Sequence, residues 1–421
     1  MKIQYSKIII TCLVLVNFTI NSIDNPHFYK ATHFWEEPRF EKDDLNSFQF
    51  WFGGGKTATG YNGCKQKVNV LQIYGPENIA QLAHGIPEEI LNKFPKTLLN
   101  TIWQKEPKNC DFGKIKFDGL FRMLELDLDF KKNFSYGLFG EIHMPFRKLE
   151  ITDISYYNLT NSCDLGPDIN YMQWLTFMAN FKQNMQKYGI NINRSSVAGI
   201  GDTSLLIGFT KNYEDTEYID FIDFTIKAGL VLPTGKTQNL SNPFALPLGY
   251  NGHLGFNGYL NISVGLYEWL TLDIFSSFIA FAKKTKEMRI KTAYEQNGFI
   301  KLAKQRANVH KGTIFSIGSY IKFDHMLNGF SVLLAYRFDK EFKTKLRLNN
   351  CSNFNTKIAN SDELLQGWFM NTLNVIGEYD FATYENPNRP RLEVFCDFAL
   401  NGKRIFRTDI FGLGFNIDYC W

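Results

Sequence analysis

The sequence predicts an all-β fold: a transmembrane, antiparallel, up-and-down β-barrel of about twelve strands, with ten to fourteen compatible. Three observations predict it. The 421 residues are 16% aromatic with a mean hydropathy of −0.22, and no apolar run after the first twenty residues reaches the ~18–20 that a spanning helix needs. Long segments alternate apolar and polar residues with a period of two. Long and short connections alternate between these segments, as they do in barrels with short periplasmic turns and long extracellular loops.

Residues 1–22 have the pattern of a secretory signal peptide. Lys2 and Lys7 give a basic start, residues 8–16 form a nine-residue apolar run, and a polar stretch with small residues follows. Nine apolar residues are too short to cross a bilayer. Cys12 lies inside the run behind Thr11, which is not the small residue that a lipoprotein signal needs. We therefore expect the chain to be exported without a lipid anchor.

Residues 23–47 precede the first predicted strand and are rich in aromatic side chains, among them Phe28, Phe34 and Trp35. Two interpretations stay open for this segment. It is either a periplasmic tail or a short plug folded inside the barrel. Residues 48–421 are assigned to the barrel itself.

Period-two alternation defines the strands. From Leu254 to Leu266 one face is apolar and the other holds Gly, Asn, Tyr and Ser, and residues 222–232 and 392–400 behave similarly. The predicted strands are 48–61, 114–130, 135–150, 199–212, 218–233, 252–266, 269–286, 312–323, 329–346, 372–384, 391–400 and 407–421. They are 10 to 18 residues long, whereas a tilted strand spans a membrane with about 9–11.

The chain ends on an alternating aromatic strand: Phe415, Ile417, Tyr419 and Trp421 share one face. This resembles the C-terminal signal of bacterial outer-membrane barrels. The resemblance implies recognition by the barrel-assembly machinery and a location in the outer membrane, in contact with its lipid and lipopolysaccharide.

Alternation places a set of charged residues on the inner face of the predicted barrel. Charged groups inside a barrel persist when they are paired or hydrated. Two interpretations stay open: a water-filled path whose acidic excess selects solutes, and a salt-bridged filling of a narrow lumen. The set is Glu125, Asp127, Glu141, Asp202, Asp223, Lys227, Asp273, Arg337, Glu378, Asp397 and Asp418.

Motifs of enzymes and metal sites are missing from the sequence. Gly53–Thr57 looks like the end of a phosphate-binding loop, but Phe50 stands where its first glycine belongs. The seven His residues have no metal-ligand spacing. A hydrolytic pairing of His143 with Asp202 or Ser204 stays a minor alternative. We expect no enzyme, no cofactor and no metal, and the net charge of +4 does not indicate nucleic-acid binding.

Two short motifs resemble a known family. Gly199–Leu205 reads G-x-G-D-x-x-L, and Leu232–Lys236 reads L-P-T-G-K. Both resemble outer-membrane transporters of the phenol meta-pathway type, which are related to the long-chain fatty acid transporters. The resemblance implies a barrel transporter and, as solutes, hydrophobic or aromatic molecules.

The predicted outer loops are long enough to fold. Residues 171–188 have helical spacing, either as a lid in the barrel mouth or as a helix across the rim. The basic stretch 283–311 binds lipopolysaccharide phosphates or is solvated. Cys64 with Cys110, and Cys163 with Cys351, are possible loop disulfides, whereas Cys396 faces lipid. We expect a channel or transporter for small solutes; the alternative is a surface-exposed structural or adhesion barrel with a closed lumen.

Overall fold

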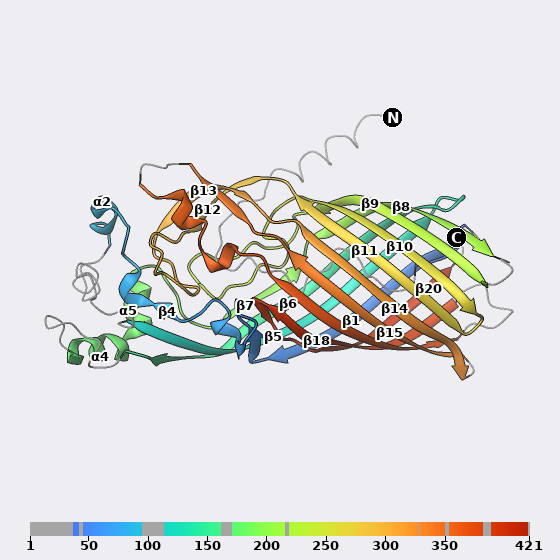
Figure 1. Cartoon of the computed structure of the whole chain (residues 1–421), viewed down its shortest axis with the longest axis horizontal. Helices are drawn as coiled ribbons and strands as arrows, with labels where there is room; N and C mark the ends of the chain where they lie inside the picture. Colours follow the sequence, from blue (N-terminus) through green and yellow to red (C-terminus); the bar gives the residue numbers. More distant parts are fainter. Residues whose placement is uncertain are drawn as a thin grey trace, which may run out of the picture.

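The computed structural model describes residues 37–41, 45–94, 113–160, 171–214, 219–327, 329–349, 353–381 and 389–419. It is a closed antiparallel barrel of twelve strands with folded loops over one end (Figure 1). The fold class and the strand number predicted from the sequence are thereby confirmed. The wall consists of β1 (Asn46–Thr57), β5 (Lys114–Asn133), β6 (Leu138–Asn158), β7 (Ser195–Ile200) with β8 (Thr203–Glu214), β9 (Phe221–Leu232), β10 (Gly255–Tyr267), β11 (Leu270–Phe281), β14 (Ile314–Leu327), β15 (Phe330–Glu341), β17 (Phe369–Asp380), β18 (Arg389–Lys403) and β20 (Ile410–Tyr419).

The barrel closes where its first strand meets its last. β1 pairs with β20 from Asn46–Tyr419 to Gly54–Phe411, and on its other edge β1 pairs with β5. β7 and β8 both pair with β6 and form one interrupted strand of the wall. Among the described residues β7 pairs with β6 alone, whereas every other wall strand has two neighbours that satisfy its backbone amides.

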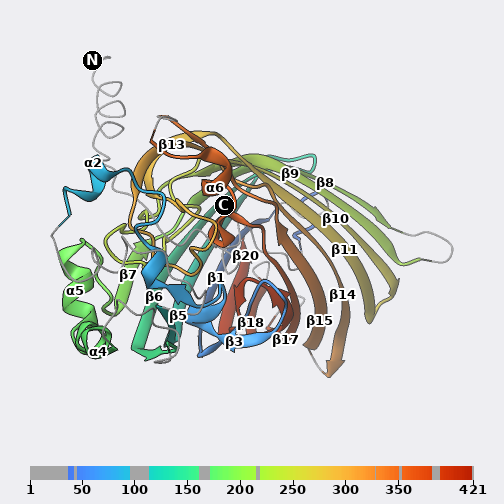
Figure 2. The same ribbon diagram turned by 60° about the vertical axis from the view of Figure 1, so that its left-hand side comes forward.

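Connections of different length lie at the two ends. Short connections join β5 to β6, β8 to β9, β10 to β11 and β14 to β15 at one end of the barrel. β1 begins and β20 ends at this same end. The longer connections lie at the other end, where they fold over the mouth (Figures 1 and 2). We call the end with the short connections the turn end and the end with the long connections the loop end.

The outer wall is apolar along its length. Large hydrophobic side chains face outward from most strands, such as Ile207, which is 65% exposed, and Ile274, which is 63% exposed. Aromatic rings gather at the turn end, where Tyr267 and Trp269 stack with centroids 5.8 Å apart. An apolar band with an aromatic edge is the surface of a membrane barrel. No helix in the described ranges is long and apolar enough to cross a membrane.

Three predicted strands continue too far toward the loop end. Residues 48–61 divide because β1 ends at Thr57 and Thr59–Tyr61 pair in a small sheet of the cap. Residues 269–286 and 329–346 each divide: β11 ends at Phe281 and β15 at Glu341, and the chain then enters a separate sheet. Between the apolar band and the loop end the residues still alternate between buried and exposed, but the buried side chains there pack against the cap loops instead of facing the lumen. This second sheet consists of β12 (Lys284–Arg289), β13 (Lys304–His310) and β16 (Lys345–Leu348).

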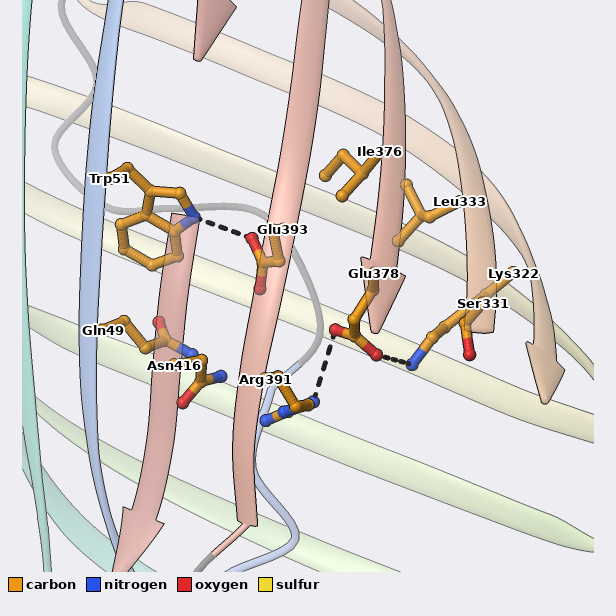
Figure 3. A pocket seen from close by; sticks show the side chains of 10 residues that line it. All are labelled: Gln49, Trp51, Lys322, Ser331, Leu333, Ile376, Glu378, Arg391, Glu393 and Asn416. Carbon is orange, nitrogen blue, oxygen red and sulfur yellow. Dashed lines mark hydrogen bonds and ion pairs between the residues drawn. The ribbon is translucent and has the colours of Figure 1, made fainter. Parts of the chain in front are cut away.

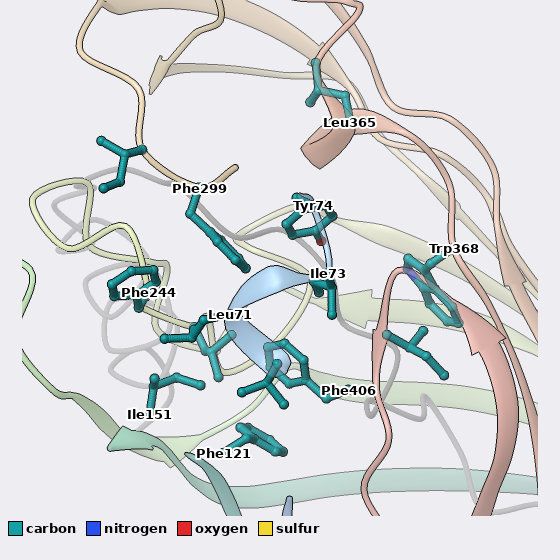
Figure 4. Packing of buried hydrophobic residues seen from close by; sticks show 14 of the residues in the cluster. Leu71, Ile73, Tyr74, Phe121, Ile151, Phe244, Phe299, Leu365, Trp368 and Phe406 are labelled. Carbon is teal, nitrogen blue, oxygen red and sulfur yellow. The ribbon is translucent and has the colours of Figure 1, made fainter. Parts of the chain in front are cut away.

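The loops form a cap with its own hydrophobic core (Figure 4). Its centre is the 3-10 helix η1 (Val70–Gln72), which packs on β5 where a bulge falls between Asp118 and Leu120. Gly119 lies at this bulge, and a Cβ there would stand 2.7 Å from Leu71 Cδ1. The close approach therefore requires glycine. The other cap elements are β2 (Thr59–Tyr61), β3 (Lys67–Asn69), β4 (Glu77–Asn78), β19 (Ile405–Phe406), η2 (Ile79–Gln81), η4 (Glu363–Leu365), α2 (Glu88–Leu91) and α6 (Thr356–Ala359).

The helical segment predicted over residues 171–188 is present as α4 (Tyr171–Ala179) and α5 (Phe181–Lys187). The Phe181 ring lies 6.1 Å from the Phe117 ring and 5.0 Å from the Tyr156 ring, both on the loop-end extension of β5 and β6. The helices thus pack on the rim, and the interpretation as a lid inside the mouth was wrong.

The apolar outer wall predicts that a charged substitution on it lowers the stability of the barrel. Ile207 lies in the middle of β8, where a Lys would place an ammonium group in hydrocarbon at a cost of about 2–4 kcal/mol. We expect Ile207→Lys to lower the free energy of unfolding in lipid vesicles by that amount, measured by denaturant titration. Thr285→Lys, on the exposed face of the cap sheet, is the control and should leave stability unchanged. Unchanged stability of Ile207→Lys would show that this face does not meet lipid.

Candidate functional site: the barrel lumen

The eleven charged residues that alternation assigned to the inner face all lie on the inside of the wall. Eight of them are at most 8% exposed: Glu125, Asp127, Glu141, Asp202, Lys227, Asp273, Arg337 and Asp397. The side chains of Asp223, Glu378 and Asp418 are 12–13% exposed. The structure divides them among a buried charge cluster, contacts within the wall, and an open cavity near the turn end.

The charge cluster joins side chains of β5, β6 and β9 on the inside of the wall, with β8 between β6 and β9. The ammonium group of Lys227 donates to Glu141 at 2.9 Å and to Glu37 at 2.6 Å, and Lys131 donates to Glu37 at 2.9 Å. All four side chains are at most 4% exposed. Lys227 also lies 4.3 Å from the centre of the Tyr259 ring. This part of the lumen is filled by charges that neutralise one another.

Residues 37–41 enter the lumen from the turn end. The Phe40 ring lies 4.8 Å from the Phe139 ring, and Asn133 Nδ2 donates to the Phe40 carbonyl at 3.1 Å. Nearer the rim, Arg39 contacts Asp223 at 2.7 Å, and Glu41 pairs with Lys211. Glu37 is the deepest anchor of this segment, which we call the luminal segment.

The electrostatics of Glu37 favour its charged form. Burial alone raises the pKa of this carboxyl, but the ammonium groups of Lys131 and Lys227 outweigh burial and bring its pKa below the usual value. Glu37 therefore remains ionised at neutral pH, and the ion pairs of the luminal segment stay intact.

Asp202 holds the two sequence motifs together. It lies between β7 and β8, and its carboxylate accepts the backbone N–H groups of Gly235 at 2.8 Å and of Tyr250 at 2.5 Å. Thr234 Oγ1 donates to the Gly201 carbonyl at 2.6 Å. Gly199–Leu205 and Leu232–Lys236 are therefore one structural unit, in which Asp202 ties a loop to the wall.

Other members of the predicted set make contacts within the wall. Asp273 accepts from Asn261 at 2.6 Å, and Asp397 accepts from Asn374 at 2.5 Å. Arg337 donates to Asp339 at 2.7 Å. Arg147, on β6, lies 3.4 Å from Glu125 and 3.5 Å from Asp127, both on β5.

A cavity of about 260 Å³ lies near the turn end, beside the luminal segment. Its lining has more acidic than basic side chains. The acids are Glu37, Asp223, Glu268, Asp324, Glu378 and Asp380, and the bases are Arg39, Lys322 and Arg391, with His325 also present. The lining thus has six carboxylates and three permanent cations, and among them Arg39 pairs with Asp223 and Lys322 pairs with Glu378.

A smaller cavity of about 20 Å³ adjoins it (Figure 3). Trp51 Nε1 donates to Glu393 at 2.9 Å. Glu378 lies 3.3 Å from Lys322 Nζ and 3.7 Å from an Arg391 nitrogen, and Arg391 donates to Asp418 at 3.1 Å. This space holds about one water molecule, so the lumen narrows here between charged side chains.

Asp129, His143 and Ser204 form one row across β5, β6 and β8. This is the arrangement that a hydrolytic barrel would need. His143 Nδ1 is 3.9 Å from Asp129 Oδ2, which is longer than a hydrogen bond, and all three residues are at most 1% exposed. The row has no access for a substrate in this structure. Within the described residues no group of three or more His, Cys, Asp or Glu side chains is placed to hold a metal ion.

A carboxylate also joins two loops of the cap. Glu77, in β4, is 1% exposed and accepts the backbone N–H groups of Phe299 at 2.5 Å and Ile300 at 3.0 Å. Gly298 has φ +77°, and a Cβ there would stand 2.2 Å from the Glu77 carboxyl carbon. Burial raises the pKa of Glu77 to about 7, although Lys301 and the two N–H groups oppose the shift.

The remaining predicted sites lie outside the lumen or outside the described residues. Phe415, Ile417 and Tyr419 share the outer face of β20, and Trp421 is beyond the described ranges. Cys64 is exposed on the cap, and Cys396 has a free thiol on the outer face of β18. Cys110, Cys163 and Cys351 are not among the described residues, so the loop disulfides stay a prediction.

Several lumen residues were missed by the sequence reasoning. Lys131 and Arg147 continue the inward positions of Asp127 and His143, so the period-two rule applied to the end of each strand would have found them. Glu37 precedes the strands, and no local pattern marks its position.

Comparison with known proteins gives only distant similarities. No protein-family model matches the sequence, and no curated protein matches it. An outer membrane channel from Pseudomonas putida F1 superposes with a TM-score of 0.46 at 11% identity, over 91% of this chain and 100% of that one. The TodX monoaromatic hydrocarbon channel, as a deletion mutant, gives 0.35 at 10% identity over 90% and 91%. The NanC porin gives 0.29 at 10% identity over 71% and 94%. The fold is assigned from the strand pairing of the chain itself.

Removing one charge from the buried cluster should be costly. Lys227→Met leaves Glu141 without its only ion-pair partner in the described structure, and Glu37 with one of two. Because an unpaired buried charge is unfavourable, we expect the free energy of unfolding to fall by about 3–5 kcal/mol. Lys211→Met is the matched control, since its ion pair with Glu41 is 40% exposed on the lysine side, and we expect little change. Equal effects of the two variants would contradict the cluster.

Protonation of Glu77 should tighten the cap. Its pKa of about 7 in the folded state exceeds the ordinary value of 4.5, so the folded state binds the proton more tightly than the unfolded state does. The stabilisation is complete below about pH 4.5 and is lost as the pH rises through 7. We expect hydrogen exchange of the 297–301 backbone to accelerate across this window and Glu77→Gln to flatten the pH dependence. Equal slopes in both proteins would exclude Glu77 as the titrating group.

Proposed function

We propose that the chain is an outer-membrane channel for small solutes whose lumen is closed at the turn end by the luminal segment. The observation that carries the proposal is Glu37, a carboxylate from outside the barrel wall that pairs with two buried lysines of the wall. A polar interior within a lipid-facing wall supports a solute path. The segment occupying that path supports a gated channel.

Opening requires the luminal segment to leave. Glu37, Phe40 and Arg39 each contact a different part of the wall, so departure breaks these contacts together. Lys227 keeps Glu141 as a partner when Glu37 leaves. Lys227 is therefore not left unpaired. Lys131 loses the one ion pair that it has among the described residues, so the open state requires water in the lumen to hydrate it.

The acidic cavity beside the segment favours cations. The cavity has six carboxylates in its lining, and acidic side chains along a narrow aqueous path concentrate cations. This lining supports hydrated, neutral or cationic small solutes. The two short motifs imply hydrophobic or aromatic solutes, for which this mainly polar cavity offers Phe221 and Tyr320 as its large ring side chains.

The location is part of the proposal. The apolar outer wall supports a membrane barrel, and the leader with the aromatic C-terminal strand supports export and insertion by the barrel-assembly machinery. The basic sheet of the cap supports contact with lipopolysaccharide at the cell surface.

A second candidate is a surface barrel with a permanently closed lumen, in which the loops carry the function. The packed core of the cap favours it, because rigid extracellular loops present a stable surface (Figure 4). The two candidates differ in whether the luminal segment can leave.

Conductance decides between them. We expect the refolded mature chain in a planar bilayer to be mostly closed, and a chain lacking residues 23–41 to conduct with cation preference. Glu37→Gln removes the charge of the deepest anchor and should raise the open probability about tenfold. Glu41→Gln, a matched change in the exposed ion pair of the same segment, should have a smaller effect. Silence of the deletion variant would support the closed barrel.

A further inference from the structure

A hollow of about 600 Å³ lies on the outer wall near the loop end, across β20, β1, β5 and β6. Its lining faces away from the lumen: Leu124 is 49% exposed, Phe411 is 55% exposed and the Lys148 side chain is 48% exposed. The hollow is therefore a feature of the membrane-facing surface and separate from the solute path.

The strand register orders this surface into rows. Phe411, Gly54, Leu124 and Lys148 are successive neighbours across the four strands. The next outward row toward the turn end is wholly apolar: Leu413, Phe52, Leu126 and Phe146. The next row toward the loop end is charged: Lys56, Arg122 and Glu150. Two residues along a strand are about 7 Å, so the apolar band ends here and the polar interface begins.

Gly54 keeps the hollow open. It occupies an outward position, and a Cβ there would lie 2.7 Å from Leu124 Cδ2 and 2.9 Å from the Met123 carbonyl oxygen. The missing side chain leaves a depression flanked by Phe411 and Leu124. This shape and chemistry fit an alkyl chain lying against the wall.

The charges above the depression are unbalanced. Lys56 and Arg122 stand directly opposite each other on neighbouring strands, an arrangement that is unfavourable for like charges. Neither has an ion pair within the described part of the chain. The two carboxylates of the lining are engaged: Glu150 pairs with Lys148 at 3.2 Å and accepts from Ser196 at 3.0 Å, and Asp409 accepts from the Ala399 N–H at 3.1 Å.

We propose that this hollow binds a phosphorylated glycolipid of the outer leaflet, of the lipid A type. An acyl chain lies in the depression at Gly54, and a sugar phosphate lies between Lys56 and Arg122. A guanidinium group binds phosphate through two parallel hydrogen bonds, and a lysine adds a point charge. The phosphate removes the repulsion between the two cations. This inference rests on the proposed outer-membrane location but not on conductance.

The test uses the full mature chain refolded in detergent and native mass spectrometry. The probes are lipid A and the same lipid with its phosphates removed. The variant is Lys56→Gln with Arg122→Gln. The matched control, Lys182→Gln with Arg194→Gln, makes the same two changes at exposed positions of the loop end that lie outside the basic cap sheet. Heat-dependent gel mobility verifies that each protein has folded.

We expect the Lys56/Arg122 variant to bind lipid A at least tenfold more weakly than the parent and the control to bind normally. The dephosphorylated lipid should bind the parent as weakly as lipid A binds the variant. Unchanged binding by the variant, equal loss in the control, or equal binding of the dephosphorylated lipid would each overturn the site. Conductance of the same samples is a separate readout, so a silent barrel that binds lipid A contradicts the channel alone.

Discussion

Pairing of β1 with β20 is the constraint on which the rest of the structure depends. It closes the sheet, so that every wall strand except the short β7 has two partners. Closure also fixes two faces for each strand. The outer face meets lipid and is apolar, and the inner face meets water or other side chains and is polar. Ile207 and Lys227, on neighbouring strands, illustrate the two environments.

In a narrow closed barrel, the charged side chains of the lumen must then find partners among themselves. Twelve strands leave a modest lumen, and here Lys227 and Lys131 meet carboxylates from the wall and from the luminal segment. The pairing holds the segment where it lies, and Glu141 contacts Lys227 as well. In the gated channel that we propose, release of the segment would leave this second ion pair in place.

The sequence predicted the barrel well because its signal is repeated in every strand. Period two assigns Glu141 and Asp273 to the inside without knowledge of their partners, since membrane and lumen impose opposite preferences on alternating residues. It predicted the roles of these residues poorly. Alternation assigned Asp202 to the lumen lining, whereas its carboxylate accepts hydrogen bonds from the backbone of Gly235 and Tyr250 and so holds a loop on the wall. These are tertiary contacts, which no local sequence pattern shows.

The sequence did not predict where the strands end, and it left the position of the luminal segment open, for related reasons. Alternation continues from β11 into β12, since the cap also has a buried face, so the pattern alone does not mark where the membrane ends. Glu37 has no periodic neighbours, and its position is set by lysines that lie 94 and 190 residues further along the chain. Contacts of such sequence separation appear only in the folded barrel.

The most direct test of the account joins the luminal segment to the wall. Phe40 and Phe139 have rings 4.8 Å apart, so cysteines at these two positions, in a background without the native cysteines, are within reach of a short bifunctional methanethiosulfonate reagent that joins the segment to β6. Single-channel recordings should show a silent protein after cross-linking and openings after reduction, with a Phe139→Cys single variant insensitive to the reductant. Equal conductance of the double variant before and after reduction would show that the segment does not close the lumen.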